Sequence, residues 1–328
     1  MTDGLAAPRG AGHVAQTTKS QQVVAVIVTY NRRELLLESL AAVQAQHRPP
    51  AAVIVVDNAS ADGTAAAVRA RFPAVRLAEL GENYGGAGGF AYGMALAIGA
   101  GADLIWAMDD DTIPEPGALA ALLAAREAYP GRAPAIVAST VLWTDGRRHP
   151  MNTPRPRPLA GAAARTAAAA CGCIPIRSAS FVSVLVDAAE CQRRGLPRAD
   201  FFLWNDDFEF TTRLLRDNVG LLCPASVVVH KTRAFGGTTV EPGERFFYEV
   251  RNKIWTLRAN SLGPAERVLY AGATLRRWVR TYAAASDRRA LRACFGRGLA
   301  AGVRTSPRPN EQVLPGLAPG PAAPRPAR

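Results

Sequence analysis

The sequence has few of the residues typical of small disulfide-rich or zinc-dependent proteins. Five cysteines occur in 328 residues, with no Cys-x-x-Cys spacing and no histidine at zinc-site distance, so neither a disulfide scaffold nor a structural zinc site is expected. No apolar run matches the roughly 20 residues of a membrane span, since the longest, Phe90 to Met108, is rich in glycine and interrupted by Asp103. With 48% hydrophobic residues, the chain can bury a sizeable core as one large domain or two ordinary ones, and disorder throughout is excluded.

Lysine is also scarce, at three residues, and the charge is unevenly distributed. Residues 1–230 carry 21 basic and 21 acidic side chains, whereas residues 231–328 carry 18 basic and 6 acidic ones and hold the whole net charge of +12. A cationic C-terminal third indicates an anionic partner such as nucleic acid, a membrane surface or a phosphorylated substrate. The alternative is a basic surface without a partner, partly produced by codon bias toward arginine.

The two ends differ from the rest in composition. Residues 1–21 are expected to be a disordered lead-in, and because residues 1–20 lack the apolar core of a secretory signal, the cytosol is the expected compartment. Residues 305–328 include the Pro-rich stretch SPRPNEQVLPGLAPGPAAPRPAR and are expected to form a disordered tail.

Apolar runs alternate with helical periodicity between these ends. The first half predicts strands at Gln22–Thr29, Ala52–Val56, Val75–Leu80 and Leu104–Met108, with helices at 34–46, 64–71 and 88–99 between them. This alternation predicts an α/β fold, a doubly wound and mostly parallel sheet with helices on both faces and ligands beyond the carboxyl ends of its strands. Further on, the patterns predict a helix at 114–129, a strand at 135–142, an irregular loop at 146–166, strands at 181–186 and 227–230, a helix at 208–216 and helices beyond Arg245.

Three consecutive aspartates, Asp109 to Asp111, follow the strand that ends at Met108. In an extended chain Asp109 and Asp111 share a side while Asp110 points elsewhere. Two carboxylates at a strand end suit a divalent cation with open positions for phosphate oxygens. A solvated acidic turn is the alternative, but three adjacent like charges repel one another and call for a cation or bases nearby. His230 ends another apolar strand and can reach the same rim, where a lone histidine is otherwise structural or exposed.

A second acidic cluster lies in the segment Trp204-Asn205-Asp206-Asp207-Phe208-Glu209. The helix dipole favours one acid at a helix start, but it does not account for three acids in four positions. Asp207 lies beside aromatic residues, which raise the proton affinity of a carboxylate, and it is therefore the candidate general base.

Polar and glycine-rich segments follow other strands of the expected sheet. Asn31 to Arg33 and Asp57-Asn58 lie at the rim, where turn formation and helix capping are alternative roles. The run Asn83-Tyr84-Gly85-Gly86-Ala87-Gly88-Gly89 opens a helix, and its glycines allow a phosphate or sugar to approach the backbone amides.

These motifs together resemble those of a known enzyme family. The succession Val28-Thr29-Tyr30-Asn31-Arg32, Val56-Asp57-Asn58-Ala59-Ser60, the glycine run, Met108 to Asp111 and Trp204 to Glu209 resembles inverting family 2 glycosyltransferases of the GT-A type, over residues 22 to about 258. Within the family, the segments are most similar to bacterial galactofuranosyltransferases of cell-wall galactan synthesis, with rhamnosyltransferases close behind. The sequence departs from the galactofuranosyl pattern at Asn205, which separates Trp204 from the acidic pair.

The resemblance implies a role for each motif residue. Asp207 would be the catalytic base, and Asp109, Asp111 and His230 would hold Mn²⁺ or Mg²⁺. Trp204, Asp206 and Glu209 would bind the acceptor. The donor would be bound by Thr29, Arg32, Asp57, Asn83, Gly85, Gly86 and Asp110.

The basic C-terminal region, residues 246–304, is expected to be a helical unit after a catalytic domain at 22–245. Apolar residues recur at Leu291, Phe295, Leu299 and Val303, with arginines largely between such positions. Amphipathic helices of this kind rest on anionic bilayers, or alternatively pack on the catalytic domain with their arginines in solvent.

The leading hypothesis is a metal-dependent inverting glycosyltransferase that moves galactofuranose from UDP-galactofuranose onto a polyprenyl-diphosphate-linked glycan of the cell wall. It would be cytoplasmic and peripheral on the inner face of the plasma membrane. The alternatives are a rhamnosyltransferase using dTDP-rhamnose, a non-catalytic membrane glycan-binding module, and an NAD-dependent oxidoreductase, since Gly86 to Ala91 fits a loose Gly-x-Gly-x-x-Ala pattern. No nucleic-acid partner is expected, because no recognition motif is visible.

Overall fold

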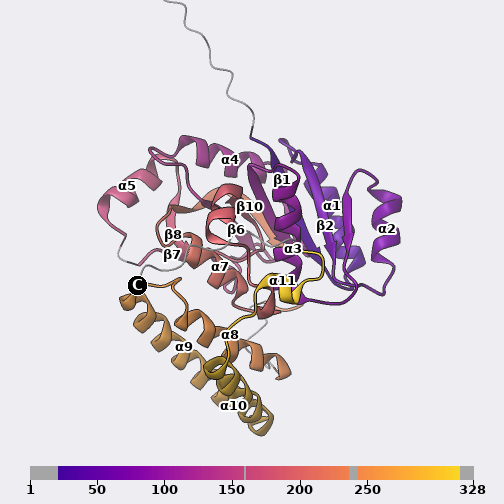
Figure 1. Ribbon diagram of the computed structural model, residues 1–328. Helices are drawn as coiled ribbons and strands as arrows, with labels where there is room; N and C mark the ends of the chain where they lie inside the picture. Colours follow the sequence, from indigo (N-terminus) through magenta and orange to yellow (C-terminus); the bar gives the residue numbers. More distant parts are fainter. Residues whose placement is uncertain (1–20, 159, 236–242, 318–328) are drawn as a thin grey trace, which may run out of the picture.

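The structure is a computed structural model that describes residues 21–158, 160–235 and 243–317 (Figure 1). A ten-stranded sheet forms its centre, in the order β3-β2-β1-β4-β9-β6-β10-β8-β7, with β5 also paired to β10. The strands are β1 (Val23–Thr29), β2 (Ala52–Asp57), β3 (Arg76–Glu79), β4 (Leu104–Asp109), β5 (Thr112–Pro114), β6 (Ile136–Leu142), β7 (Arg155–Pro156), β8 (Ile174–Ser178), β9 (Val184–Asp187) and β10 (Gly220–His230).

Helices cover the sheet and extend beyond it. They are α1 (Arg33–Gln44), α2 (Thr64–Arg71), α3 (Gly85–Gly99), α4 (Ala118–Ala128), α5 (Ala162–Ala170), α6 (Ala188–Arg194), α7 (Asp206–Leu214), α8 (Phe246–Arg258), α9 (Pro264–Ala284), α10 (Arg288–Arg304) and α11 (Asn310–Val313). The expected fold class is confirmed, because β1 to β4 pair in parallel, as do β6 and β10, while β9 runs antiparallel between the two groups.

Strand register brings the ends of the first strands to one edge of the sheet. Thr29 lies opposite Asp57, and Val28 lies opposite Asp109. Because these strands are parallel, their carboxyl ends face the same side. The short β5 turns back against β10 and pairs Thr112 with His230. The polar residues after β1, β2, β4 and β10 therefore meet at one rim.

Two apolar layers enclose the sheet, one on each face. On one face Leu36 of α1 and Leu122 of α4 pack against buried strand residues, and on the other Phe90 of α3 and Phe210 of α7 do so. The strands themselves are buried on both faces, which explains why their sequences are continuous apolar runs instead of alternating ones.

Helices α8, α9 and α10 form an arm beside the sheet (Figure 1). Phe246 and Val250 of α8 pack against Leu291 and Cys294 of α10. The two helices approach closely at Gly302, where a Cβ atom would lie 2.8 Å from Cβ of Ile254. Within the described part of the chain, no helix combines the length and apolarity that crossing a bilayer requires.

A buried arginine ties α9 to the sheet and to α7. Arg177 of β8 is 1% exposed, and its guanidinium donates to the carbonyl oxygens of Thr212 (2.5 Å) and Ser261 (2.7 Å) and to both carboxylate oxygens of Glu266 (2.6 and 2.9 Å). Since Thr212 belongs to α7 and Glu266 to α9, this one side chain fixes the arm against the helix that carries the second acidic cluster.

Several local expectations are corrected by the structure. The helix expected from Pro114 begins at Ala118, because residues 112–114 pair with β10 as β5. The expected loop at 146–166 contains β7 and the start of α5.

The tail is ordered over residues 305–317, contrary to the expected disorder from residue 305. Leu314 is 1% exposed and packs beside Ala91 of α3 and Ala199, and Arg308 pairs with Asp200 at 2.7 Å. The remaining tail, 318–328, and the lead-in 1–20 lie outside the described residues. All five cysteines are free thiols.

Candidate active site

The triple aspartate and His230 form one cluster at the rim of the sheet. Asp109 ends β4, and the β5 to β10 pairing carries His230 back to Asp111. One ligand atom from each of Asp109, Asp111 and His230 lies within 4.8 Å of the others. The three residues therefore lie together, as the sequence predicts.

The donor set fits a divalent cation. Oδ1 of Asp111 is buried without a hydrogen-bond donor in the described part of the chain, and His230 Nε2 lies 2.8 Å from it without hydrogen-bond alignment. Nδ1 of His230 donates to Oδ1 of Asn152 at 3.0 Å, which orients the ring with Nε2 toward the carboxylates. Two carboxylates and an imidazole suit Mn²⁺ or Mg²⁺, with positions left for other oxygen ligands.

The electrostatics of this cluster also call for a cation. Burial, and then the charge of Asp111, raise the pKa of Asp109 to about 7. Burial alone would raise the pKa of Asp111 as well, but its interaction with His230 holds that pKa below the ordinary value. The same contact outweighs burial at His230 and raises the pKa of the imidazole. Asp109 is hard to ionise because it is buried beside the charged Asp111, and a bound cation would stabilise both carboxylates in their charged form.

Asp110 binds Thr29 at the end of β1 and Arg32 just before α1. Its Oδ2 accepts from Thr29 Oγ1 at 2.8 Å and its Oδ1 from Arg32 at 3.1 Å. Arg32 also donates to Asp111 at 2.6 Å and lies half exposed at the cavity. Burial raises the pKa of Asp110 to about 6 against the lowering effect of Arg32. Arg32 thus links the predicted donor residues to the predicted metal ligands.

The second acidic cluster begins α7 after a strained loop. Phe202, Trp204 and Asn205 all have positive φ, at 63°, 64° and 65°, in a region that non-glycine residues rarely occupy. Asn252 of α8 holds this loop, because its Nδ2 donates to the carbonyl oxygens of Phe201, Leu203 and Trp204 at 2.8 to 2.9 Å. The strain is offset by these bonds, and the loop is fixed.

Asp206 and Asp207 follow this loop at the start of α7. Burial raises the pKa of both carboxyl groups, and the charge of Asp207 adds to the effect at Asp206. The charge of Asp109 also raises the pKa of Asp206. The two acidic clusters, about 100 residues apart in sequence, therefore influence each other directly.

Both clusters line one cavity of about 440 Å³. Asp109, Asp111 and His230 lie on its wall together with Trp204, Asp206 and Asp207. Gly86 and Phe90 of α3 line it on the sheet side, and Phe246 and Trp278 line it from the helical arm. The arm is therefore part of the site, although the sequence suggested a separate unit after residue 245.

Sequence reasoning missed several residues of this cavity. Glu249 accepts from Asn205 Nδ2 (2.8 Å), from Trp278 Nε1 (3.2 Å) and from Arg277, so it joins the strained loop to α9. Arg155 of β7 lies over the ring of Phe208, with Cζ 4.8 Å from the ring centroid. The mixed aromatic and charged segment 246–253 was the available signal for Glu249, whereas nothing local marked Arg155.

Other predicted residues lie near the rim without lining the cavity. Asp57 Oδ1 accepts from the backbone N–H of Ser60, and Asn83 Oδ1 from that of Gly85, so the alternative turn roles are present at both. Gly85 packs against the carbonyl of Phe202, whereas Gly86 lines the cavity. Their predicted contacts with a donor remain predictions.

Glu209 is not placed for acceptor binding. It is 1% exposed, does not line the cavity, and pairs with Arg213 at 3.0 Å and Arg198 at 3.4 Å. These charges outweigh burial and lower its pKa. We therefore assign Glu209 a structural role, because it is two residues from Asp207, on the opposite side of the helix, and is paired with two arginines.

Comparisons with known proteins agree with this geometry. The model of glycosyl transferase family 2 matches residues 24–187, which is half of the chain. The chain belongs to this family, and it is a glycosyltransferase of the GT-A fold.

The similar curated proteins are galactofuranosyltransferases. The chain is 47% identical over 98 residues to galactofuranosyltransferase GlfT1 of Mycolicibacterium smegmatis, which covers 30% of this chain and 32% of that one. It is 40% identical over 113 residues to GlfT1 of Mycobacterium tuberculosis, which covers 34% of this chain and 37% of that one. The matched segments thus span about a third of each relative.

Solved structures share the fold at low sequence identity. S. aureus TarS 1–349 in complex with UDP-GlcNAc has a TM-score of 0.62 at 14% identity, covering 90% of this chain and 84% of that chain. The mannosyltransferase PcManGT from Pyrobaculum calidifontis, in complex with GDP-Man and Mn²⁺, has a TM-score of 0.53 at 19% identity, covering 90% and 79%.

The glycine run serves packing within this fold and does not indicate a dehydrogenase. A Cβ atom at Gly89 would lie 2.4 Å from Val28 Cγ1, and one at Gly93 2.5 Å from Val26 Cγ1. These glycines let α3 lie close on β1. Membership of a glycosyltransferase family decides against both the NAD-dependent oxidoreductase and the non-catalytic module.

Proposed function

We propose that this glycosyltransferase transfers galactofuranose from UDP-galactofuranose, with inversion, onto a polyprenyl-diphosphate-linked glycan. The observation that carries the proposal is the placement of Asp109, Asp111 and His230 in the same cavity as Asp207. The names of the curated relatives support galactofuranose as the sugar.

The donor half of the site is assigned to the rim of β1, β2 and β4. Asp109, Asp111 and His230 would hold Mn²⁺ or Mg²⁺, which offsets the negative charge that develops on the leaving diphosphate. Arg32 would add a fixed positive charge beside the leaving diphosphate, since it lines the cavity and donates to Asp111. Thr29, Asp57, Asn83, Gly85 and Gly86 complete the proposed donor site, with Asp110 orienting Thr29 and Arg32.

The acceptor half is assigned to the start of α7 and the loop before it. Asp207 accepts the proton of the acceptor hydroxyl, whose oxygen bonds to the anomeric carbon as the bond from that carbon to the diphosphate oxygen breaks. Burial raises the pKa of Asp207, which makes it a better proton acceptor than an exposed carboxylate. Trp204 and Asp206 line the same wall and would contact the acceptor sugar.

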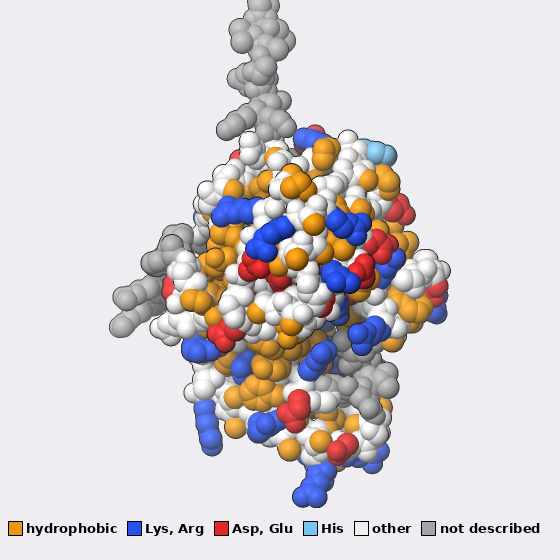
Figure 2. Space-filling view, turned by 90° about the vertical axis from the view of Figure 1, so that its right-hand side faces the viewer, with side chains coloured by type: hydrophobic (Ala, Val, Ile, Leu, Met, Phe, Trp, Pro, Cys, Tyr) orange, Lys and Arg blue, Asp and Glu red, His pale blue; other side chains and the backbone are white. Residues whose placement is uncertain are grey.

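The helical arm is assigned to the membrane side. Val268, Leu275 and Val279 of α9 are 76%, 61% and 59% exposed, and the part of the surface that the arm forms in Figure 2 shows hydrophobic and basic side chains near one another. Exposed apolar residues beside arginines favour binding to an anionic bilayer. A peripheral position on the inner face of the plasma membrane follows from this proposal.

A donor panel tests the proposed function. Purified protein is offered UDP-galactofuranose, UDP-galactopyranose, UDP-glucose and dTDP-rhamnose with Mn²⁺, and donor hydrolysis and thermal stabilisation are measured. We expect UDP-galactofuranose to give the largest stabilisation and the fastest hydrolysis. A preference for dTDP-rhamnose would assign the enzyme to rhamnosyl transfer and contradict the proposed sugar.

A further inference from the structure

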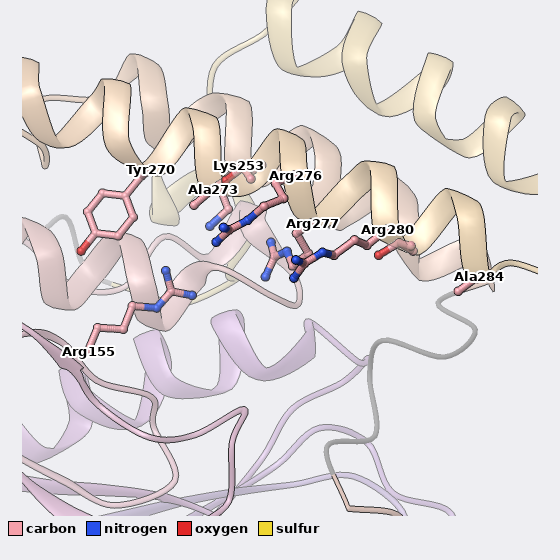
Figure 3. A pocket seen from close by; sticks show the side chains of 10 residues that line it. Arg155, Lys253, Tyr270, Ala273, Arg276, Arg277, Arg280 and Ala284 are labelled. Carbon is pink, nitrogen blue, oxygen red and sulfur yellow. The ribbon is translucent and has the colours of Figure 1, made fainter.

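A second cavity, of about 600 Å³, lies between β7, α8 and α9 and continues from the first (Figure 3). Arg155, Arg277 and Thr281 line both cavities. We call the second cavity the basic pocket. The residues that line it are Arg155, Lys253, Tyr270, Ala273, Thr274, Arg276, Arg277, Arg280, Thr281 and Ala284.

The basic pocket gathers more positive charge than the neighbouring carboxylates offset. Five of its lining residues are arginine or lysine and none is acidic, and Figure 3 shows Arg155 reaching from below toward Lys253, Arg276 and Arg277. The nearby carboxylate of Glu249 already accepts from Arg277, Trp278 and Asn205. Among the described residues only Arg277 of these five cations is paired with a carboxylate, so the pocket favours an anion from outside the chain.

One of these cations is buried as well. Lys253 is 2% exposed, lies 4.3 Å from the centroid of Phe208 and has no ion pair in the part of the chain that the structure describes. Burial lowers the pKa of Lys253 to about 7. Burying an unpaired cation costs free energy that a bound anion recovers, so the pocket is built for a ligand with more than one negative charge.

The position of the arginines on α9 indicates what is attached to that anion. Arg276 and Arg280 are one helical turn apart and share a face. At 100° per residue, this face lies between the pocket-facing positions 273, 277 and 284 and the exposed apolar positions Leu275, Val279 and Tyr282. A ligand whose charged group entered the pocket would meet an apolar surface on leaving it past these arginines.

We propose that the basic pocket binds the diphosphate of the lipid-linked acceptor and so orients its glycan toward Asp207 in the adjoining cavity. This inference rests on the proposed function for the identity of the acceptor. Phe208 connects the two cavities, because it follows Asp207 directly in sequence and its ring contacts both Arg155 and Lys253. The headgroup and the reacting hydroxyl would thus be held on either side of one side chain.

The first test measures anion binding without turnover. Inorganic pyrophosphate is titrated into the full-length protein by calorimetry in EDTA, so that no metal ion bridges it to Asp109 and Asp111. We expect Arg276→Gln/Arg280→Gln to weaken pyrophosphate binding at least tenfold, because each arginine supplies charge-assisted hydrogen bonds to phosphate. Arg71→Gln/Arg76→Gln is the matched control, since it removes the same charge from α2 and β3 at the opposite edge of the sheet. Equal weakening by both double variants, or by neither, would overturn the proposal.

The second test separates an acceptor headgroup from bilayer headgroups. Transfer is measured to a polyprenyl-diphosphate-linked glycan in detergent and to the same glycan on an octyl group, and pelleting with phosphatidylglycerol vesicles is measured alongside. The pocket variant should raise KM at least tenfold for the diphosphate acceptor only, with unchanged octyl-glycan KM, whether or not vesicle binding also weakens. Loss of vesicle binding with an unchanged KM for the diphosphate acceptor would show that the pocket binds bilayer headgroups, and would refute the proposal. If the parent hydrolyses no sugar nucleotide at all, the proposed function fails, whereas the pyrophosphate titration still decides the pocket.

Discussion

The contact between Gly85 and the strained loop gives a sharp test of how the site is assembled. Gly85 has φ +69°, and a Cβ atom on it would lie 2.0 Å from the carbonyl oxygen and 2.6 Å from the carbonyl carbon of Phe202. Both atoms are backbone, so no side-chain rotation can relieve the overlap. The same carbonyl accepts from the N–H of Ala87 at 3.1 Å, which joins α3 to the loop that leads to Asp207.

The expected cost of Gly85→Ala follows from two terms. An alanine in the left-handed region costs about 1 kcal/mol, and forcing the loop away from α3 costs about 1–3 kcal/mol more. A total of about 2–4 kcal/mol corresponds to a fall in Tm of roughly 3 to 7 °C for a chain of this length. Because the loop shifts with the clash, kcat should also fall.

The neighbouring glycine is the matched control. A Cβ atom on Gly86 would meet no heavy atom within 4 Å, and its φ lies outside the left-handed region. Gly86→Ala should therefore leave Tm unchanged or slightly raised, although it lines the cavity. The two variants are compared by calorimetric melting and urea unfolding. Equal melting temperatures would refute the assigned packing between α3 and the loop.

Three further predictions concern the hydrogen bonds of Arg177, the cation site and the pH dependence of stability. Arg177→Met should lower the free energy of unfolding by about 3–5 kcal/mol, because it removes two hydrogen bonds to the carboxylate of Glu266 and two to buried carbonyl oxygens. Glu266→Gln should cost less in the same urea titration, and the reverse order would contradict the role assigned to Arg177. Asp111→Asn should weaken Mn²⁺ binding at least tenfold in a calorimetric titration, and unchanged affinity would rule out this ligand set. Burial lowers the pKa of Lys253 to about 7, so between pH 7 and about 10 the folded chain holds fewer protons at Lys253 than the unfolded chain. The free energy of unfolding should therefore rise with pH across that window. Lys253→Met should flatten the rise, and an unchanged slope would show that Lys253 does not cause it. The charged groups that act on Lys253 are Glu249, Arg277, Arg155 and Asp207.

The sheet could be predicted wherever a local pattern determines it. The apolar runs of β1, β2 and β4 are buried on both faces and ended close to the expected residues, and the bounds of α2 were those expected. The three-residue β5 exists only through its pairing with β10, more than 100 residues away, so no local signal marks it. The order of residues 305–317 likewise depends on Leu314 entering a site formed by α3 and residue 199.

In the candidate site, too, only the residues whose positions follow from a local pattern could be predicted. Asp109, Asp111 and His230 could be placed together, because strand ends in a parallel sheet share an edge. Glu249 and Arg277 could not, since they enter the cavity only through the docking of the helical arm on the catalytic part. The acceptor role expected of Glu209 does not fit its surroundings, because its partners Arg198 and Arg213 come together with it only in the folded chain.

The most direct measurement of the central claim is the separation of donor binding from turnover in Asp207→Asn. The account predicts that this variant binds UDP-galactofuranose with Mn²⁺ at an affinity within about twofold of the parent, while kcat for transfer falls by roughly 10²–10⁴, as for loss of a general base. Transfer at a rate near that of the parent would contradict the assignment of Asp207 as the base, and with it the division of the cavity into a metal-bound donor side and an acceptor side.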